Sequence, residues 1–152
     1  MARKTKDVTI SAAGRDYGKT FRLTEMFATP AEKWAFRAVT ALGRAGYRLP
    51  EDLTGGFMSV IAVVGMSALL RIDPYEAEPL LDEMMSCVQR VEDPLVTRPL
   101  VEDDTEEVAT RLLLRDEVAA LHVGFSPVER LRTWVSGLRD QIDSSPIPTS
   151  EA

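Results

Sequence analysis

The eight residues at positions 13–20 decide which fold the start of this chain can adopt. They are close to a phosphate-binding loop and read Ala13-Gly14-Arg15-Asp16-Tyr17-Gly18-Lys19-Thr20. Such a loop leaves a buried strand and opens a helix, whose free N–H groups hold the phosphates. Here polar and apolar residues alternate over residues 20–25, and also over residues 7–11, which is the period of a strand. The stretch therefore predicts the turn of a β-hairpin over residues 6–26, with Thr20 beginning a strand and Arg15 and Lys19 exposed.

Composition and charge limit the classes of function. The chain has 152 residues, of which 45% are hydrophobic and 28% charged, as in a globular domain with a core. Its net charge of −6 argues against general nucleic-acid binding, which needs a basic face; we interpret Arg3, Lys4 and Lys6 as a solvated chain end. We expect no signal peptide, and the apolar run at 57–70 is too short to span a bilayer. Because Cys87 is the only cysteine, no internal disulfide can form, which fits a reducing compartment.

Helix signals follow the hairpin. Capping residues before a proline mark three helix starts, at Thr29-Pro30, Asp73-Pro74 and Ser126-Pro127. Five helices are expected: three from these starts, one from the apolar run and one from an acidic stretch at 103–107. They span about 30–45, 54–72, 74–90, 104–123 and 127–142. The segment from Pro94 to Val101 is expected to be extended, and Pro99 would restrict any strand there to a sheet edge.

These elements predict an α+β fold that is mainly α. We expect the N-terminal hairpin to be followed by about five helices in a bundle. The chain shows no internal repeat and no domain linker, so residues 1–143 are expected to form a single globular domain. Residues 144–152 hold prolines and serines without an apolar period and are expected to be a flexible, disordered tail.

No catalytic or metal-binding constellation stands out in the sequence. His122 is the only histidine, and it falls on a different expected helix from Cys87, so the two cannot make a typical zinc site. We expect His122 at a helix C-terminus and Cys87 in the core, because no basic neighbour would activate the thiol. The sequence therefore predicts a protein without enzymatic activity, with no catalytic, cofactor-binding or metal-binding residues and no cofactor.

The helix expected at 104–123 carries two arginines between two apolar strips. At about 100° per residue, Arg111 and Arg115 fall between the strips. The first strip consists of Val108, Leu112 and Ala119, and the second of Leu114, Val118 and Leu121. Glu107 precedes Arg111 by one turn and can pair with it. We interpret Glu107, Arg111 and Arg115 as a structural network, and an anion or partner site is the alternative.

Aromatic and methionine side chains are the best sign of a binding surface. Several occur close together near the end of the hairpin, namely Phe21, Met26, Phe27, Trp34 and Phe36. Trp34 and Phe36 are two residues apart on a helix, so one is expected in the core and the other near the surface. Phe27 either staples the helix start or belongs to an exposed patch. Since methionine adapts to varied partners, the candidate partner-binding surface comprises Met26, Phe27, Phe36, Met84 and Met85.

Several segments of the chain resemble a family of tail assembly chaperones from tailed phages. The likeness begins with GRDYGKTFRLTEM at 14–26 and AEKWAFR at 31–37. It continues with LLDEMMSCV at 80–88, RPLV at 98–101, EEVATRL at 106–112 and HVGFS at 122–126. The similar region covers nearly the whole chain up to about residue 138.

The resemblance implies a bacteriophage protein that acts in the host cytoplasm during tail assembly and is absent from the mature virion. Its implied partners are the tape measure protein and the tail tube protein, with neither a nucleic acid nor a membrane involved. Two alternatives remain open: a structural virion component, such as a tail completion or head–tail joining protein, and a nucleotide-binding enzyme. The sequence does not decide whether the protein self-associates or has a longer frameshifted form.

Overall fold

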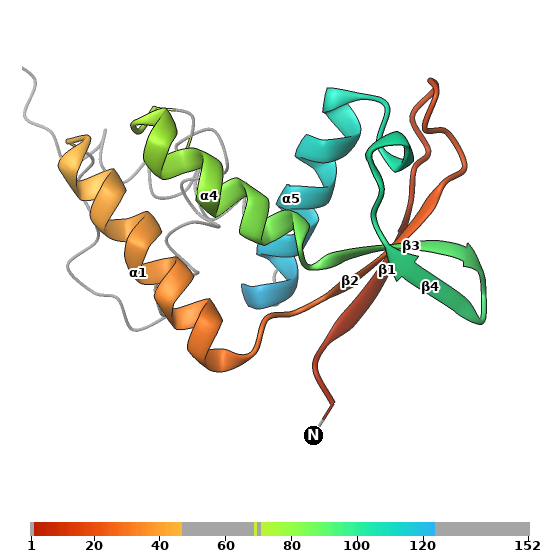
Figure 1. The fold of residues 1–152 in the computed structure, drawn as a ribbon, viewed down its shortest axis with the longest axis horizontal. Helices are drawn as coiled ribbons and strands as arrows, with labels where there is room; N and C mark the ends of the chain where they lie inside the picture. Colours follow the sequence, from red (N-terminus) through yellow and green to blue (C-terminus); the bar gives the residue numbers. More distant parts are fainter. Residues whose placement is uncertain (1, 47–68, 70, 124–152) are drawn as a thin grey trace, which may run out of the picture.

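The computed structural model describes residues 2–46, 69 and 71–123 of the chain (Figure 1). The strands are β1 (Thr5–Thr9), β2 (Thr20–Thr24), β3 (Val88–Asp93) and β4 (Val96–Pro99). The helices are α1 (Ala28–Arg44), α4 (Pro74–Met85) and α5 (Val108–Val123), with a short 3-10 turn, η1 (Glu102–Asp104). The sheet lies at one end of the described part, α5 packs between the sheet and α4, and α1 lies beyond α4 (Figure 1).

The sheet has one buried and one polar face. Its four strands are antiparallel in the order β1-β2-β3-β4. Phe21 and Leu23 of β2 point to the same face, and both are buried together with Val88, which lies opposite Leu23 on β3. On the other face Arg22 donates two hydrogen bonds to the directly opposed Asp7, at 2.8 and 2.9 Å. This alternation gives β2 the period-2 pattern that identified it as a strand.

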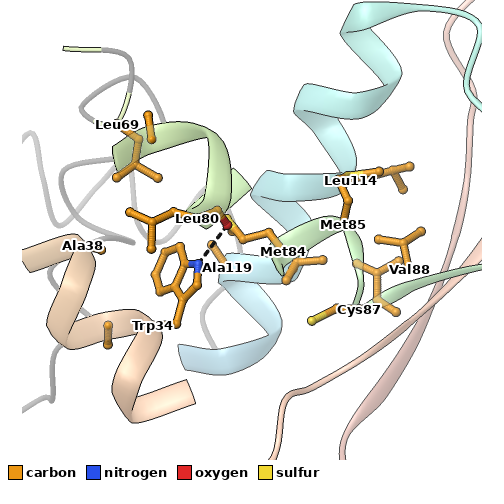
Figure 2. Packing of buried hydrophobic residues seen from close by; sticks show 14 of the residues in the cluster. Trp34, Ala38, Leu69, Leu80, Met84, Met85, Cys87, Val88, Leu114 and Ala119 are labelled. Atoms are coloured by element: carbon orange, nitrogen blue, oxygen red, sulfur yellow. Dashed lines mark hydrogen bonds between the residues drawn. The ribbon is translucent and has the colours of Figure 1, made fainter. Parts of the chain in front are cut away.

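The core joins the sheet to all three described helices. Trp34 of α1 is fully buried, and its Nε1–H donates to the carbonyl oxygen of Leu80 on α4 at 2.9 Å (Figure 2). Leu114 and Val118 of α5 are also fully buried in the same cluster. The hydrogen bond satisfies the one polar atom of the indole, so the large ring can be buried at little cost.

The expected bundle of about five helices is wrong. The described residues contain a four-stranded sheet and three α-helices. The helix expected at 74–90 ends at Met85, and residues 88–93 form a central strand instead. The expected helix extends too far because Val88 continues the helical spacing of the apolar residues in α4. A short apolar run fits the period of a helix and that of a strand equally well. The missed signal is Asp93-Pro94, because the Asp93 carboxylate accepts a hydrogen bond from the N–H of Leu95 at 2.7 Å and turns β3 into β4.

Two helix starts also differ from the prediction. Helix α1 begins at Ala28, so Thr29 lies inside the helix and does not cap it. Helix α5 begins at Val108, not at 104, because residues 102–104 fold as η1 and residues 105–107 link η1 to the helix. There the Asp104 carboxylate accepts a hydrogen bond from the N–H of Val101 at 2.8 Å, and such local bonds compete with a helix.

Other predictions are confirmed. Thr20 begins β2, and β4 is an edge strand that ends at Pro99. Helix α4 begins at Pro74, and the Asp73 carboxylate caps it by accepting from the N–H of Tyr75 at 2.9 Å. None of the helices described here has the length and apolar character needed to cross a membrane.

Parts of the expected fold lie outside the described residues. These are the helix at 127–142, the tail at 144–152 and the helix at 54–72 apart from positions 69, 71 and 72. The single domain at 1–143 therefore stays a prediction.

Candidate functional site

Residues 13–20 form a loop that docks on the start of α5. The loop closes where Ile10 donates to the carbonyl oxygen of Lys19 at 2.9 Å and Gly18 donates to that of Ile10 at 2.8 Å. The Asp16 carboxylate is 1% exposed and accepts hydrogen bonds from the backbone N–H groups of Glu106 and Glu107, both at 3.0 Å. Asp16 therefore caps α5, and its negative charge lies at the favourable end of the helix dipole.

Lys19 completes this cluster from the same loop. Its Nζ lies 2.8 Å from Asp16 Oδ1 and 3.0 Å from Glu106 Oε2, and it also donates to the carbonyl oxygens of Asp103 and Asp104. The Lys19 side chain is only 20% exposed, so the expectation of an exposed turn charge is wrong for it. Since four protein oxygens surround the ammonium and a strand follows the loop, these residues do not form a phosphate-binding loop.

The charges of Asp16 and Lys19 stabilise each other. Burial acts to raise the pKa of Asp16, but hydrogen bonds from Lys19, from Thr110 and from the two backbone N–H groups hold that pKa well below its usual range. The hydrogen bond to Asp16 is the main reason why the pKa of Lys19 is raised. Both groups therefore stay ionised at neutral pH, which suits a structural ion pair and not proton transfer.

A second buried carboxylate, Asp104, joins η1 to the sheet. Arg98 of β4 donates to both oxygens of the Asp104 carboxylate, at 2.7 and 2.8 Å, and Arg90 Nε lies 3.8 Å away. The hydrogen bonds from Arg98 are the main reason why the pKa of Asp104 is lowered. Both buried aspartates of this region are thus engaged in fixing the connection between β4 and α5.

The arginine network expected on α5 does not form as predicted. Glu107 turns to the loop, where its Oε1 accepts from the N–H of Arg15 at 3.1 Å and lies 3.6 Å from Arg15 Nε. Arg111 donates to the Thr105 hydroxyl at 3.1 Å. Arg115 Nε is buried without a hydrogen-bond partner in the described part of the chain, and burial together with the nearby Arg111 lowers its pKa. In the described part of the chain the two arginines repel each other, and Glu107 pairs with Arg15 and not with Arg111.

Gly14 has a backbone conformation that favours glycine where the loop meets Glu107. Its φ is +152°, and a Cβ there would lie 2.7 Å from Glu107 Oε1. We expect Gly14→Ala to lower the free energy of unfolding by about 1–3 kcal/mol, measured by urea denaturation. Gly18→Ala is the matched control, because Gly18 has φ +80° but nothing within 4 Å of the added Cβ. Equal losses in the two variants would show that the contact with Glu107 is unimportant.

A groove of about 580 Å³ opens where β2 leads into α1 and α4 leads into β3. The side chains around it are a mixture of apolar and charged groups, among them Arg3, Met26, Phe27, Lys33, Glu83 and Cys87. Phe27 is 63% exposed, so it does not staple the helix start into the core. An exposed aromatic ring in a groove with cations nearby is a candidate for binding another protein.

The structure separates the five residues of the candidate partner-binding surface. Met26, half-buried, and Phe27 line the groove, whereas Phe36 is 57% exposed on α1 and does not line it. Met84 and Met85 are buried in the core, so their assignment to the surface is corrected (Figure 2). The face of α4 that carries them packs against the neighbouring helices, and the sequence pattern alone does not show which neighbour covers it.

His122 links α5 to the segment that carries the groove. Its Nε2 accepts a hydrogen bond from the N–H of Met26 at 2.9 Å, and its Nδ1 lies 2.8 Å from the carbonyl oxygen of Val118. With Nε2 accepting from Met26, Nδ1 is placed to donate to the carbonyl oxygen of Val118. Its predicted place in the last turn of a helix is confirmed, while the contact with Met26 carries no sequence signal.

Cys87 lies in the wall of the groove without being reactive. It belongs to the core cluster, as predicted, and burial raises the pKa of its thiol to about 11. The thiol is thus protonated at neutral pH and a poor nucleophile. Over residues 2–46, 69 and 71–123, no group of three His, Cys, Asp or Glu side chains could hold a metal ion.

Fold and site together define a small α+β protein. Its buried aspartates join the loop at 13–20, η1 and α5, and the groove beside Phe27 is lined by both apolar and charged side chains. No family model, curated protein or solved structure matches the chain.

Proposed function

We propose that this chain is a tail assembly chaperone of a tailed bacteriophage. It would act in the host cytoplasm without enzymatic activity, binding the tape measure protein and the tail tube protein during virion morphogenesis and leaving before the virion is mature. The observation that carries the proposal is the groove, in which the exposed Phe27 stands beside Met26. A chaperone that keeps a partner soluble needs such apolar surface, because the partner's own apolar face must be covered.

The resemblance of residues 14–26, 31–37 and the later segments to this family supports the same function. The structure of the loop at 13–20 also supports a non-enzymatic function. Asp16 and Lys19 pair with each other and bind the segment at the start of α5, so neither is available to bind a nucleotide phosphate. A surface that binds other proteins is therefore a better proposal than a nucleotide-hydrolysing site.

Co-expression with the tape measure protein from the same phage genome tests this function. We expect the chain to increase the soluble fraction of the tape measure protein and to elute with it in size-exclusion chromatography. Phe27→Ser should weaken the complex, whereas Leu95→Ser, at a 93% exposed position in the β3–β4 turn, should not. Unchanged solubility together with separate elution would reject the chaperone function.

Mass spectrometry of purified particles separates the chaperone from a structural virion component. A chaperone should be absent or present in trace amounts. Stoichiometric copies in the particle would favour a tail completion or head–tail joining protein instead.

A further inference from the structure

We propose that the groove beside Phe27 binds an acidic peptide segment that also carries apolar side chains. Such a segment would belong to the protein partner, so this proposal rests on the proposed function and adds the chemistry that the partner must present. Two properties of the groove lead to it: an exposed aromatic ring in contact with an arginine, and an excess of positive charge.

The apolar part of the groove is centred on Phe27. The guanidinium of Arg3 lies over the Phe27 ring, 4.2 Å from its centroid, and also donates to the carbonyl oxygen of Glu25 at 3.3 Å. Arg3 thereby covers one face of the ring. Pro30 and the half-buried Met26 line the same groove. An apolar side chain from a partner would find an exposed aromatic surface here.

The charged part of the groove favours an anionic partner. Its lining holds three cations, Arg3, Lys33 and Arg37, against two carboxylates, Glu25 and Glu83. This excess of one positive charge occurs in a chain whose net charge is −6. Because the protein as a whole is acidic, positive charge in this groove is a local feature, and it favours a partner segment with negative charge.

The pairing within the groove leaves two of the cations available. Glu83 forms an ion pair with Arg37 at 2.5 Å. Lys33 is exposed and has no ion-pair partner in the part of the chain that the structure describes, and Arg3 likewise contacts a ring and a carbonyl oxygen there but no carboxylate. Carboxylates of a bound segment could therefore pair with Lys33 and Arg3 while an apolar neighbour packs on Phe27.

Two synthetic fluorescent peptides test this assignment. Both carry the same apolar residues, and their polar positions are glutamate in one and lysine in the other. We expect the acidic peptide to bind the full-length protein about tenfold or more tightly than the basic one in fluorescence anisotropy at low salt, with the preference falling at high salt. Equal binding of the two peptides, or tighter binding of the basic one, would overturn the proposal.

Variants locate the binding in the groove. Lys33→Glu should remove the preference for the acidic peptide, whereas Arg71→Glu, a matched charge reversal at an exposed residue outside the groove lining, should leave it. Phe27→Ser should weaken the acidic peptide's binding, while Leu95→Ser should not. Equal effects of the two charge reversals would show that only overall charge matters. Circular dichroism should show all four variants folded, because each changed side chain is exposed.

The outcome is independent of the co-expression experiment. A peptide preference located at Lys33 without a tape measure complex would support the groove chemistry and reject the chaperone function. A complex that forms without any peptide preference would support the chaperone function and reject the acidic segment as its ligand.

Discussion

Replacing Asp16 by asparagine is expected to lower the free energy of unfolding by about 2–4 kcal/mol at neutral pH. The Asp16 carboxylate accepts from two backbone N–H groups at the start of α5 and from Lys19 Nζ. An amide has one oxygen, so its NH2 group would face a donor, and the half-buried Lys19 ammonium would lose its nearest anion. The measurement is urea denaturation followed by circular dichroism. Asp103→Asn is the matched control, because Asp103 is exposed and contributes its backbone oxygen to Lys19.

The loss of stability caused by Asp16→Asn should become smaller as the pH falls into the acid range. The pKa of Asp16 is lower in the folded protein than its ordinary value of 3.8, so the unfolded chain binds more protons in acid. The stabilisation by ionised Asp16 is therefore complete above the ordinary pKa and is lost as the pH falls from there towards the folded pKa. We expect the stability difference between wild type and Asp16→Asn to be constant at neutral pH and to shrink below about pH 4. A difference that stays constant into acid, or one no larger than that of Asp103→Asn, would contradict this role for Asp16.

Local signals predicted the parts of the fold that depend on neighbouring residues. The hairpin follows from the alternation around Thr20 and the glycine-containing loop, and the start of α4 follows from Asp73 as a cap. Strand β3 was missed because its pairing with β2 joins residues far apart in the sequence, as in the pair Leu23 and Val88. Periodicity over a few residues cannot tell a short strand from the end of a helix.

The candidate site was predictable only in part, for the same reason. The cluster of aromatic residues near Phe27 indicated the groove, and the two-residue spacing of Trp34 and Phe36 correctly predicted that one is buried and the other exposed. The burial of Met84 depends on which helices cover α4, and the capping by Asp16 depends on a contact with Glu106 across the fold. Neither contact can be predicted from the residues next to it in the sequence.

Trp34→Ala is expected to lower the free energy of unfolding by about 3–5 kcal/mol, as for other fully buried aromatic side chains. The indole fills the space between α1 and α4 and hydrogen-bonds to the Leu80 carbonyl oxygen (Figure 2). Trp34→Phe keeps most of the packing and removes the hydrogen bond, so it should lower that free energy less, by about 1–2 kcal/mol. Urea denaturation measures both.

Phe36→Ala is the control for Trp34, since it removes an aromatic ring from the same helix at an exposed position and should change the free energy of unfolding by less than about 1 kcal/mol. Equal losses at the two positions would contradict the packing of α1 described here. The same variants connect stability to the groove, because α1 carries Lys33 and Pro30 while α4 carries Glu83. Loosening the contact between α1 and α4 separates these walls, so Trp34→Ala should weaken the binding of the acidic peptide even under conditions in which the protein stays folded.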